Sequence, residues 1–437
     1  MYWILKAQHK KRGRKTEMKV TRLYKVVGLI LLFCVFGLGD VFAGHLVTSK
    51  KAPVRADSLS SSQIITRIQG GVALKIAGEE RLYGTGYWKI ELPNGGVGYI
   101  YKTHVRYKEE AMPGDTESED GPATGFLQVH MINVGQADAI YIVCPDGKHQ
   151  MVIDSGELNM GIRYPGSVKE FKNYIRSHQS INDPIELVVS SHPHSDHIAG
   201  MDWLLMNYEV DLYLDSGKEN DKSATYESLE AMIIENEINR KQLTDIELPE
   251  IDFCSRSDVK VTILRPQGFD EEGMHINDYS IVIRMDYRSS SFLFTGDSEE
   301  ELESKLLTDP STAPLLDTDW LKVAHHGSET STTEKFLEAV TPDIAAISSG
   351  GETIGTNGSE EDEAEGHLHP RMSTIENLLP YVSERSGIKT TLEAFNSSTK
   401  KWEQVTTKAA IYITNNDGDL VFLSDGDLIW KLGDKAN

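Results

Sequence analysis

Three histidines and an aspartate lie within six positions directly after a hydrophobic run. The run Ile185–Ser190 has the length and composition of a buried strand. The cluster that follows it consists of His192, His194, Asp196 and His197. Such a cluster would be costly to bury without a partner, whereas neutral imidazole nitrogens and carboxylate oxygens are good ligands for divalent metal ions. The cluster therefore predicts a metal site at the end of a strand.

Two further hydrophobic runs end in possible metal ligands. One leads into Gly296 and Asp297, and the other into His325 and His326. A carboxylate fixed at a strand end, beside a glycine that permits close backbone approach, suits a bridge between two metal ions. In isolation such an aspartate is more often part of a plain turn, and paired histidines more often lie in a core or on a surface. Their position downstream of the first cluster favours one shared metal centre.

The segment after the paired histidines has the pattern of a helix start. Residues 331–334 have the composition of an N-cap, and a helix is predicted at 333–340. Free N–H groups at a helix N-terminus bind anions. We therefore expect a phosphate to rest against residues 331–333, with Ser328 and Ser331 near the substrate.

The succession of motifs at 192–197, 294–297 and 325–328 is similar to that of the metallo-β-lactamase superfamily. More narrowly, it resembles the branch related to the extracellular hydrolase domain of the ComEC competence protein, and the motifs at 133–139 and 277–282 also fit that branch. The resemblance implies an α/β fold, the αββα sandwich of two sheets with helices outside them. It also implies a hydrolase that uses two divalent metal ions, Zn or Mn.

The resemblance assigns roles to individual residues. Six would hold the two ions: His192 and His194 the first, Asp196, His197 and His326 the second, and Asp297 both. Asp196 would also position the attacking water, and His325 would lie beside the substrate or transfer a proton. The residues expected beside the substrate or behind the ligands are Asp154, Asn277, Ser328, Ser331 and His369.

One departure from the superfamily concerns the first metal. The family often has a further histidine between the two histidine clusters, where this chain has Asn277 and Asp278, with His275 just upstream. The first ion would then be held more weakly, which favours Mn over Zn. An acidic insert at about 352–365 is longer than the family leads us to expect, and is interpreted as a rim loop.

The remaining segments differ in composition. Basic residues precede the apolar run 26–39, so residues 1–44 are interpreted as a secretory signal peptide or, alternatively, an uncleaved membrane anchor. Short strand-like runs between glycine-rich turns at 53–108 predict a small all-β barrel. It resembles the bacterial Src-homology-3-like domains, which implies peptidoglycan binding; a generic barrel with no ligand is the alternative. Residues 109–124 form an acidic linker, and 125–437 the hydrolase domain.

Charge and cysteine content limit the partners and the compartment. A net charge of −23 argues against a broad polyanion-binding surface, so metal ions in a cleft would have to attract a nucleic acid substrate. Of the three cysteines, Cys144 and Cys254 lie in the part expected to be exported. They could form a disulfide or remain buried thiols, because spacing alone does not decide pairing.

These expectations describe an extracellular enzyme, secreted or attached to the cell surface. The expected reaction is phosphoester hydrolysis by a water activated between two divalent ions, as in a phosphodiesterase or nuclease-like enzyme. The alternatives are hydrolysis of another ester class, such as a phosphocholine ester, a lactone or a β-lactam, and a non-enzymatic wall-binding protein. Contact with a membrane is expected only through residues 1–44.

Overall fold

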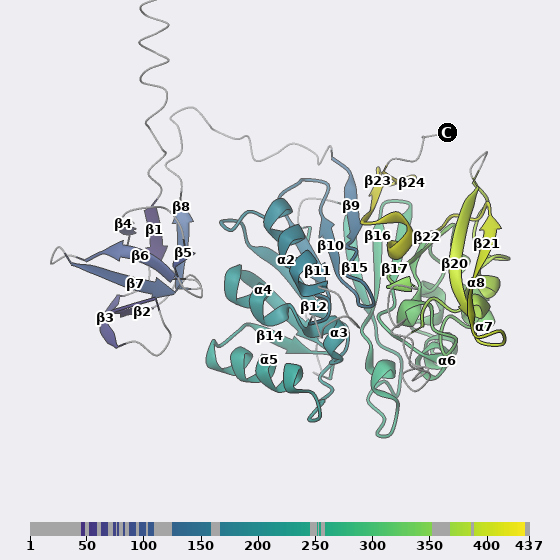
Figure 1. The fold of residues 1–437 in the computed structure, drawn as a ribbon, viewed down its shortest axis with the longest axis horizontal. Coiled ribbons are helices and arrows are strands. Elements are labelled where there is room, and N and C mark those ends of the chain that lie inside the picture. Colours follow the sequence, from purple (N-terminus) through teal and green to yellow (C-terminus); the bar gives the residue numbers. More distant parts are fainter. Residues whose placement is uncertain are drawn as a thin grey trace, which may run out of the picture. The chain divides into compact units, whose positions relative to one another are not determined.

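A computed structural model gives the fold of the chain (Figure 1). It forms two compact units, residues 1–117 and 118–437. The structure describes residues 45–48, 52–58, 63–68, 73–75, 77, 82–83, 87–92, 96–101, 104–108, 125–158, 167–244, 251, 253–254, 258–351, 368–385 and 389–432. The predicted signal segment, acidic linker and acidic insert lie outside these ranges. Within them, no helix is long and apolar enough to cross a membrane.

The described part of the N-terminal unit consists of two antiparallel sheets, with the strand orders β4-β1-β8 and β3-β2-β7-β6-β5. The strands are β1 His45–Thr48, β2 Ala52–Arg55, β3 Ile64–Ile68, β4 Ala73–Lys75, β5 Leu82–Tyr83, β6 Tyr87–Glu91, β7 Val97–Tyr101 and β8 Val105–Lys108. Val54, Trp88 and Ile100 belong to its small buried core. Strand β1, which precedes the predicted start at residue 53 and is too short to be recognised from its own sequence, pairs with both β4 and β8.

The C-terminal unit contains an eight-stranded sheet, β14-β13-β12-β11-β10-β9-β23-β24, and a six-stranded sheet, β15-β16-β17-β18-β19-β22. The first comprises β9 Leu127–Met131, β10 Ile140–Val143, β11 Gln150–Ile153, β12 Ile185–Ser190, β13 Val210–Asp215, β14 Arg240–Gln242, β23 Leu420–Ser424 and β24 Ile429–Lys431. The second comprises β15 Val259–Leu264, β16 Val282–Tyr287, β17 Ser290–Phe294, β18 Trp320–Lys322, β19 Ile344–Ile347 and β22 Ile411–Ile413. A separate hairpin joins β20 Thr390–Asn396 to β21 Lys401–Thr407.

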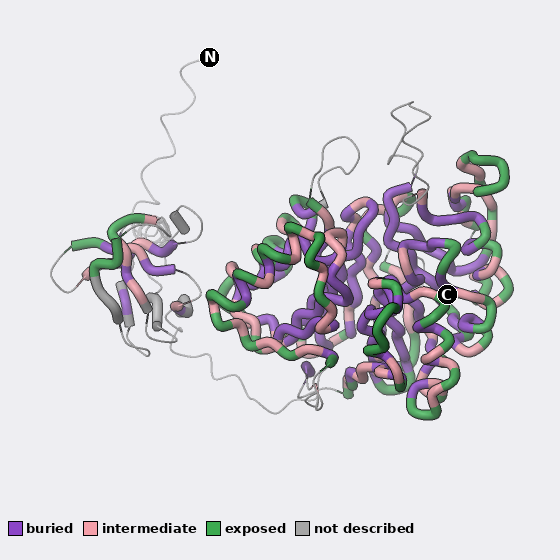
Figure 2. Tube along the Cα trace, turned by 90° about the horizontal axis from the view of Figure 1, so that it is seen from below, coloured by how far each residue is buried: buried purple, intermediate pink, exposed green. Residues whose placement is uncertain are grey.

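Helices cover the outer faces of both sheets, as Figure 1 shows for α2, α4 and α5 on one side and α6, α7 and α8 on the other. Their bounds are α2 Ser167–His178, α3 Ser195–Ile198, α4 Met201–Asn207, α5 Ala224–Glu235, α6 Glu300–Thr308, α7 Glu334–Val340, α8 Met372–Leu378 and α9 Thr414–Asp417. Buried residues follow the strands, and exposed residues lie mostly on the outside (Figure 2). The predicted αββα sandwich is confirmed.

The strand β12 shows why hydrophobic runs lead to the functional residues. It pairs in parallel with β11 and β13 and is buried on both faces, since Val188 packs toward the helices and Val189 toward the other sheet. The strands β17 and β18 are also parallel to each other. Parallel strands end at the same edge of a sheet, so the segments after β17 and β18 lie side by side.

A disulfide between Cys144 and Cys254 links the two sheets of the sandwich. Cys144 directly follows β10 of the eight-stranded sheet, and Cys254 precedes β15 of the six-stranded sheet. Their Cα atoms lie 6.0 Å apart. Of the two possibilities that the sequence left open, the structure therefore shows the disulfide.

Candidate metal centre

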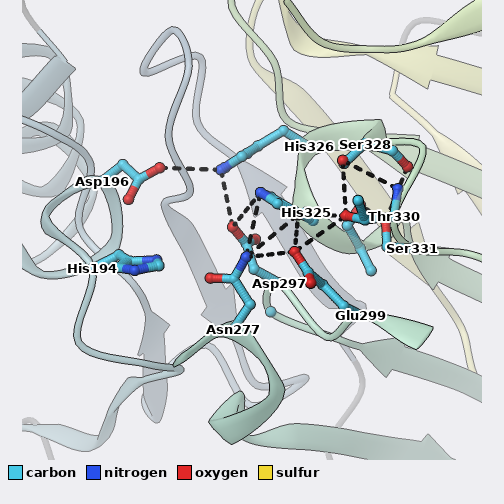
Figure 3. Close-up of polar contacts among 12 residues, drawn as sticks. His194, Asp196, Asn277, Asp297, Glu299, His325, His326, Ser328, Thr330 and Ser331 are labelled. Carbon is cyan, nitrogen blue, oxygen red and sulfur yellow. Dashed lines mark hydrogen bonds and ion pairs between the residues drawn. The ribbon is translucent and has the colours of Figure 1, made fainter. Parts of the chain in front are cut away.

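Four of the predicted ligands converge where the ends of β12, β17 and β18 meet. Asp196, His197, Asp297 and His326 each bring one ligand atom within 4.8 Å of all the others. The Nε2 atoms of His197 and His326 lie 3.1 and 3.4 Å from the same carboxylate oxygen of Asp297. His326 Nε2 is also 3.5 Å from Asp196. Segments up to 130 positions apart thus form one cluster, as Figure 3 shows for Asp196, Asp297 and His326.

The chemistry of this cluster fits a divalent metal ion. In the described part of the chain, the buried Nε2 atoms of His197 and His326 make no hydrogen bond. Burial alone would lower the pKa of both imidazoles, but the carboxylates around them, above all Asp297, outweigh it. The pKa of His197 is held well above its usual value and that of His326 is raised to about 10. Without a cation, protons take its place between the imidazoles and carboxylates.

The Nδ1 atoms of these two imidazoles contact other groups of the protein, on the side away from the cluster. His197 Nδ1 lies 2.8 Å from Asp154, whose carboxylate also accepts two 2.7 Å hydrogen bonds from Ser191. His326 Nδ1 lies 3.0 Å from the carbonyl oxygen of Ser348. Such contacts set the tautomer and orientation of a ligating histidine. The structure therefore places Asp154 where the sequence predicted it, against a histidine of the metal cluster.

A buried ion pair that the sequence interpretation missed lies beneath the cluster. The Lys322 ammonium group pairs with Asp138 and donates a 2.6 Å hydrogen bond to the carbonyl oxygen of Gly296. Burial alone would lower the pKa of Lys322, but Asp138 and Asp297 raise it, so the group remains charged. Asp138 in turn lies 3.4 Å from His326 Nδ1. A lysine inside an otherwise apolar strand was the one signal in the sequence for this pair.

The predicted ligands of the first metal lie beside this cluster. His192 Nε2 is 2.9 Å from His194 Nδ1, and the ring of His192 is centred 4.1 Å from that of His197. Burial holds the pKa of His192 well below its usual value, so its imidazole is neutral and able to bind a metal. Asn277, at the position where the family often has a histidine, donates a 2.9 Å hydrogen bond to Glu299 instead. The first site therefore has fewer strong ligands than the second.

His325 lies beside the same cluster, on the side away from His194 (Figure 3). Its Nε2 atom lies 3.9 Å from Asp297, and its Nδ1 atom 3.1 Å from Glu299. Glu299 also accepts hydrogen bonds from Asn277 and from Thr330. The sequence interpretation missed Glu299, because it is one of three consecutive glutamates and nothing local distinguishes it.

An open cleft of about 740 Å³ leads to the metal cluster. Asp196, Asp297 and His326 line it together with His194 and His325. This volume is typical of ligand pockets. Lys222 and His369 also line the cleft, and the ring of His369 is centred 5.5 Å from that of His325. The predicted placement of His369 beside the substrate is therefore compatible with the structure.

The predicted phosphate seat at residues 331–333 is wrong. The backbone N–H groups of Thr332 and Thr333 donate hydrogen bonds of 2.5 and 3.0 Å to the buried carboxylate of Glu303 in α6. Ser331 is itself buried and donates to the carbonyl oxygen of Ala324. A side chain of the protein thus occupies the positions that an anion would need. Sequence periodicity could not show which distant carboxylate would reach this segment.

Ser328, the other serine expected near the substrate, makes contacts with its own loop and with α8. Its hydroxyl lies 3.0 Å from that of Thr330, and its carbonyl oxygen accepts a hydrogen bond from Thr374. The residue is buried and does not line the cleft. We therefore assign Ser328 to holding the loop that carries His325 and His326.

Comparisons with known proteins give a family match and two relatives. A family model described as the metallo-beta-lactamase superfamily matches residues 132–351. The chain is 26% identical over 234 residues to ComE operon protein 3 of Bacillus subtilis, which covers 51% of this chain and 28% of that protein. It is 45% identical over 74 residues to Recombination protein 2 of Haemophilus influenzae, which covers 17% of this chain and 9% of that protein. The matched region is thus less than a third of each relative.

Among solved structures, the chain is similar to Igni18, described as a metallo hydrolase from the archaeon Ignicoccus hospitalis. The match has 8% sequence identity and a TM-score of 0.35, and covers 64% of this chain and 98% of that one.

Proposed function

The chain belongs to the metallo-beta-lactamase superfamily, and we propose that this metal-dependent hydrolase is exported and cleaves phosphodiesters in the manner of a nuclease. The observation that carries the proposal is the cluster of two buried imidazoles and two carboxylates at the floor of an open cleft. The cluster can hold a cation, and the cleft gives a substrate access to it.

Two groups of residues would hold the two metal ions. Asp196, His197, His326 and Asp297 would hold one ion, and His192 and His194 the other. When bound, two divalent ions supply an activated water and stabilise charge on the phosphoryl oxygens. Asp196, whose side chain keeps 24% of its surface exposed, can accept a hydrogen bond from the attacking water.

His325 would give a proton to the leaving oxygen. Glu299 holds its Nδ1 atom, so Nε2 is directed toward Asp297 and the cleft. A histidine fixed in this way is the usual general acid for such a step. Because Glu303 occupies the N–H groups of Thr332 and Thr333, we expect the charge of Lys222 in the cleft lining to favour an anionic substrate.

The choice of a phosphodiester also draws on the relatives. One of them is named a recombination protein, which favours DNA as the substrate. With the negative net charge of this chain, we propose that nucleic acid meets the protein only in the cleft.

A panel of substrates tests the proposal. The purified chain, loaded with Mn or Zn, is expected to hydrolyse bis-nitrophenyl phosphate and to shorten single-stranded DNA or RNA. The His326→Ala variant is expected to lose both activities. Absence of phosphodiester cleavage with either metal, or turnover of a lactone, a phosphocholine ester or nitrocefin in its place, would refute it.

Export is supported by the Cys144–Cys254 disulfide, because disulfides persist mainly outside the reducing cytoplasm. The small N-terminal β-unit would then attach the enzyme to peptidoglycan. Cell fractionation of the full chain and of a chain lacking residues 1–44 tests the location, and sedimentation with purified cell walls tests attachment. Recovery of the full chain in the cytoplasm would contradict export.

A further inference from the structure

The Cys144–Cys254 disulfide lies beside two other potential metal ligands. Cys144 begins the turn between β10 and β11, and the same turn carries Asp146 and His149. One ligand atom each from Cys144, Asp146 and His149 lies within 4.8 Å of the others. Cys254 is bonded to Cys144, so its sulfur adjoins this three-residue cluster without belonging to it. None of these four residues belongs to the metal centre described above.

The turn holds the carboxylate of Asp146 in a fixed orientation. One oxygen accepts backbone hydrogen bonds of 2.8 and 3.2 Å from Lys148 and His149, and the other lies 2.5 Å from His149 Nδ1. Burial would raise the pKa of Asp146, but these hydrogen bonds lower it below its usual value. The carboxylate is therefore charged and already directed at the imidazole that would share a cation with it.

The imidazole and the carboxylate are the solvent-exposed members of the group. The side chains of His149 and Asp146 keep 26% and 15% of their surface exposed, whereas Cys144 and Cys254 are 0% and 1% exposed. An ion could thus arrive past the imidazole and carboxylate and reach the sulfurs from there. The buried sulfurs would be shielded from exchange once a metal is bound.

We propose that reduction of the Cys144–Cys254 disulfide converts this cluster into a second kind of metal site, with Cys144, Cys254, His149 and Asp146 as four ligands for a zinc-like ion. A dithiol reductant supplies the two electrons: its two thiols become a disulfide, and the protein disulfide becomes two thiols. Binding of the divalent ion then replaces the two thiol protons, which are released to solvent.

Four ligands of these types match the tetrahedral sites that bind Zn²⁺. Thiolates also distinguish this site from the histidine–carboxylate centre, since soft sulfur ligands select a different range of metals. The site would keep the two sheets linked when the disulfide is absent, because Cys144 and Cys254 follow and precede strands of different sheets. The cross-link would be covalent under oxidising conditions and metal-mediated under reducing ones.

Cobalt provides a direct probe, because thiolate ligation gives it a charge-transfer absorption that histidine and carboxylate ligands do not. The full chain is titrated with Co²⁺ in its oxidised form and after reduction with a phosphine that is removed by desalting. The reduced protein is expected to bind about one further equivalent of metal and to show the thiolate band. Excess Zn²⁺ should abolish the band.

Variants separate the proposed site from loose binding by free cysteines. His149→Ala should weaken the added site at least about tenfold, and Cys254→Ser should remove most of the thiolate band. His178→Ala, which alters an exposed histidine of α2, is the matched control and should leave the band unchanged.

Three results would overturn the proposal. They are a reduced protein without the thiolate band, a band that His149→Ala does not affect, and a band already present in the oxidised protein. A further measurement guards against unfolding: Zn²⁺ should raise the Tm of the reduced wild type by more than that of reduced His149→Ala, in which only the histidine–carboxylate centre remains to bind it. Equal rises in both would also count against it.

Discussion

His197 is held between two carboxylates, with Nδ1 2.8 Å from Asp154 and Nε2 3.1 Å from Asp297. Asp154 therefore decides which nitrogen of His197 is available to a metal. Asp154→Asn keeps the shape but removes the charge that fixes the imidazole, so metal affinity should fall about 10- to 100-fold. A titration against a competing chelator measures this.

The control for Asp154→Asn is Asp258→Asn. Asp258 pairs with Arg288 at the surface, and its side chain is 69% exposed. This variant should bind metal like the wild type. An Asp154→Asn variant that is folded and retains full affinity would show that the contact with His197 is incidental.

Glu303 gives the protein a pH-dependent stability near neutrality. Burial raises the pKa of this carboxyl to about 7, against the hydrogen bonds from Thr333 and Thr332 that lower it. Because the pKa of Glu303 is raised in the folded protein, the stabilisation that its protonated carboxyl contributes is fully present below the pKa of the unfolded chain, about 4.5. That stabilisation is lost as the pH rises through 7. The loss across this window is about 3 kcal/mol.

Glu303→Gln should remove that dependence, because glutamine does not titrate. The difference in unfolding free energy between wild type and Glu303→Gln should thus change by about 3 kcal/mol from pH 4.5 to 7.5, as measured by urea denaturation. Glu301→Gln alters an exposed glutamate of the same helix and should run parallel to the wild type. If the difference in unfolding free energy between wild type and Glu303→Gln stayed constant with pH, the carboxyl of Glu303 in the wild type would titrate normally.

The sequence made the strand-end ligands predictable because each motif is local. The cluster after β12, Asp297 after β17 and the histidines after β18 each stand directly behind a hydrophobic run, and parallel strands deliver such residues to one edge. What it could not show are contacts between distant segments. Asp138 and Lys322 are 184 positions apart, and the reach of Glu303 to Thr332 depends on how α6 packs against the following loop.

Replacing one member of the buried Asp138–Lys322 pair should lower the free energy of unfolding far more than replacing both. Lys322→Met leaves the carboxylate of Asp138 buried without its cation, which typically costs about 3–5 kcal/mol. Lys322→Met combined with Asp138→Asn removes both charges and should recover part of that loss. Chemical denaturation of the metal-free proteins checks this, and a single variant as stable as the wild type would contradict it.

His325 and His326 are neighbours in sequence, but replacing each of them should have a different effect on metal binding and activity. His326 contributes to the metal cluster, whereas His325 lies 3.9 Å from Asp297 and is held by Glu299. His325→Ala should retain bound metal and lower kcat on a phosphodiester by about 10²- to 10⁴-fold, as expected when a proton donor is removed. His326→Ala should lose metal and activity together.

The substrate's leaving group sharpens the test of His325. A nitrophenolate leaves readily without a proton, while the alkoxide of a nucleotide does not, so His325→Ala should impair DNA cleavage much more than cleavage of bis-nitrophenyl phosphate. Glu299→Gln should show the same pattern in milder form, because it loosens the hold on Nδ1 without removing the imidazole. Equal losses on both substrates would argue that His325 binds the phosphate instead of transferring a proton.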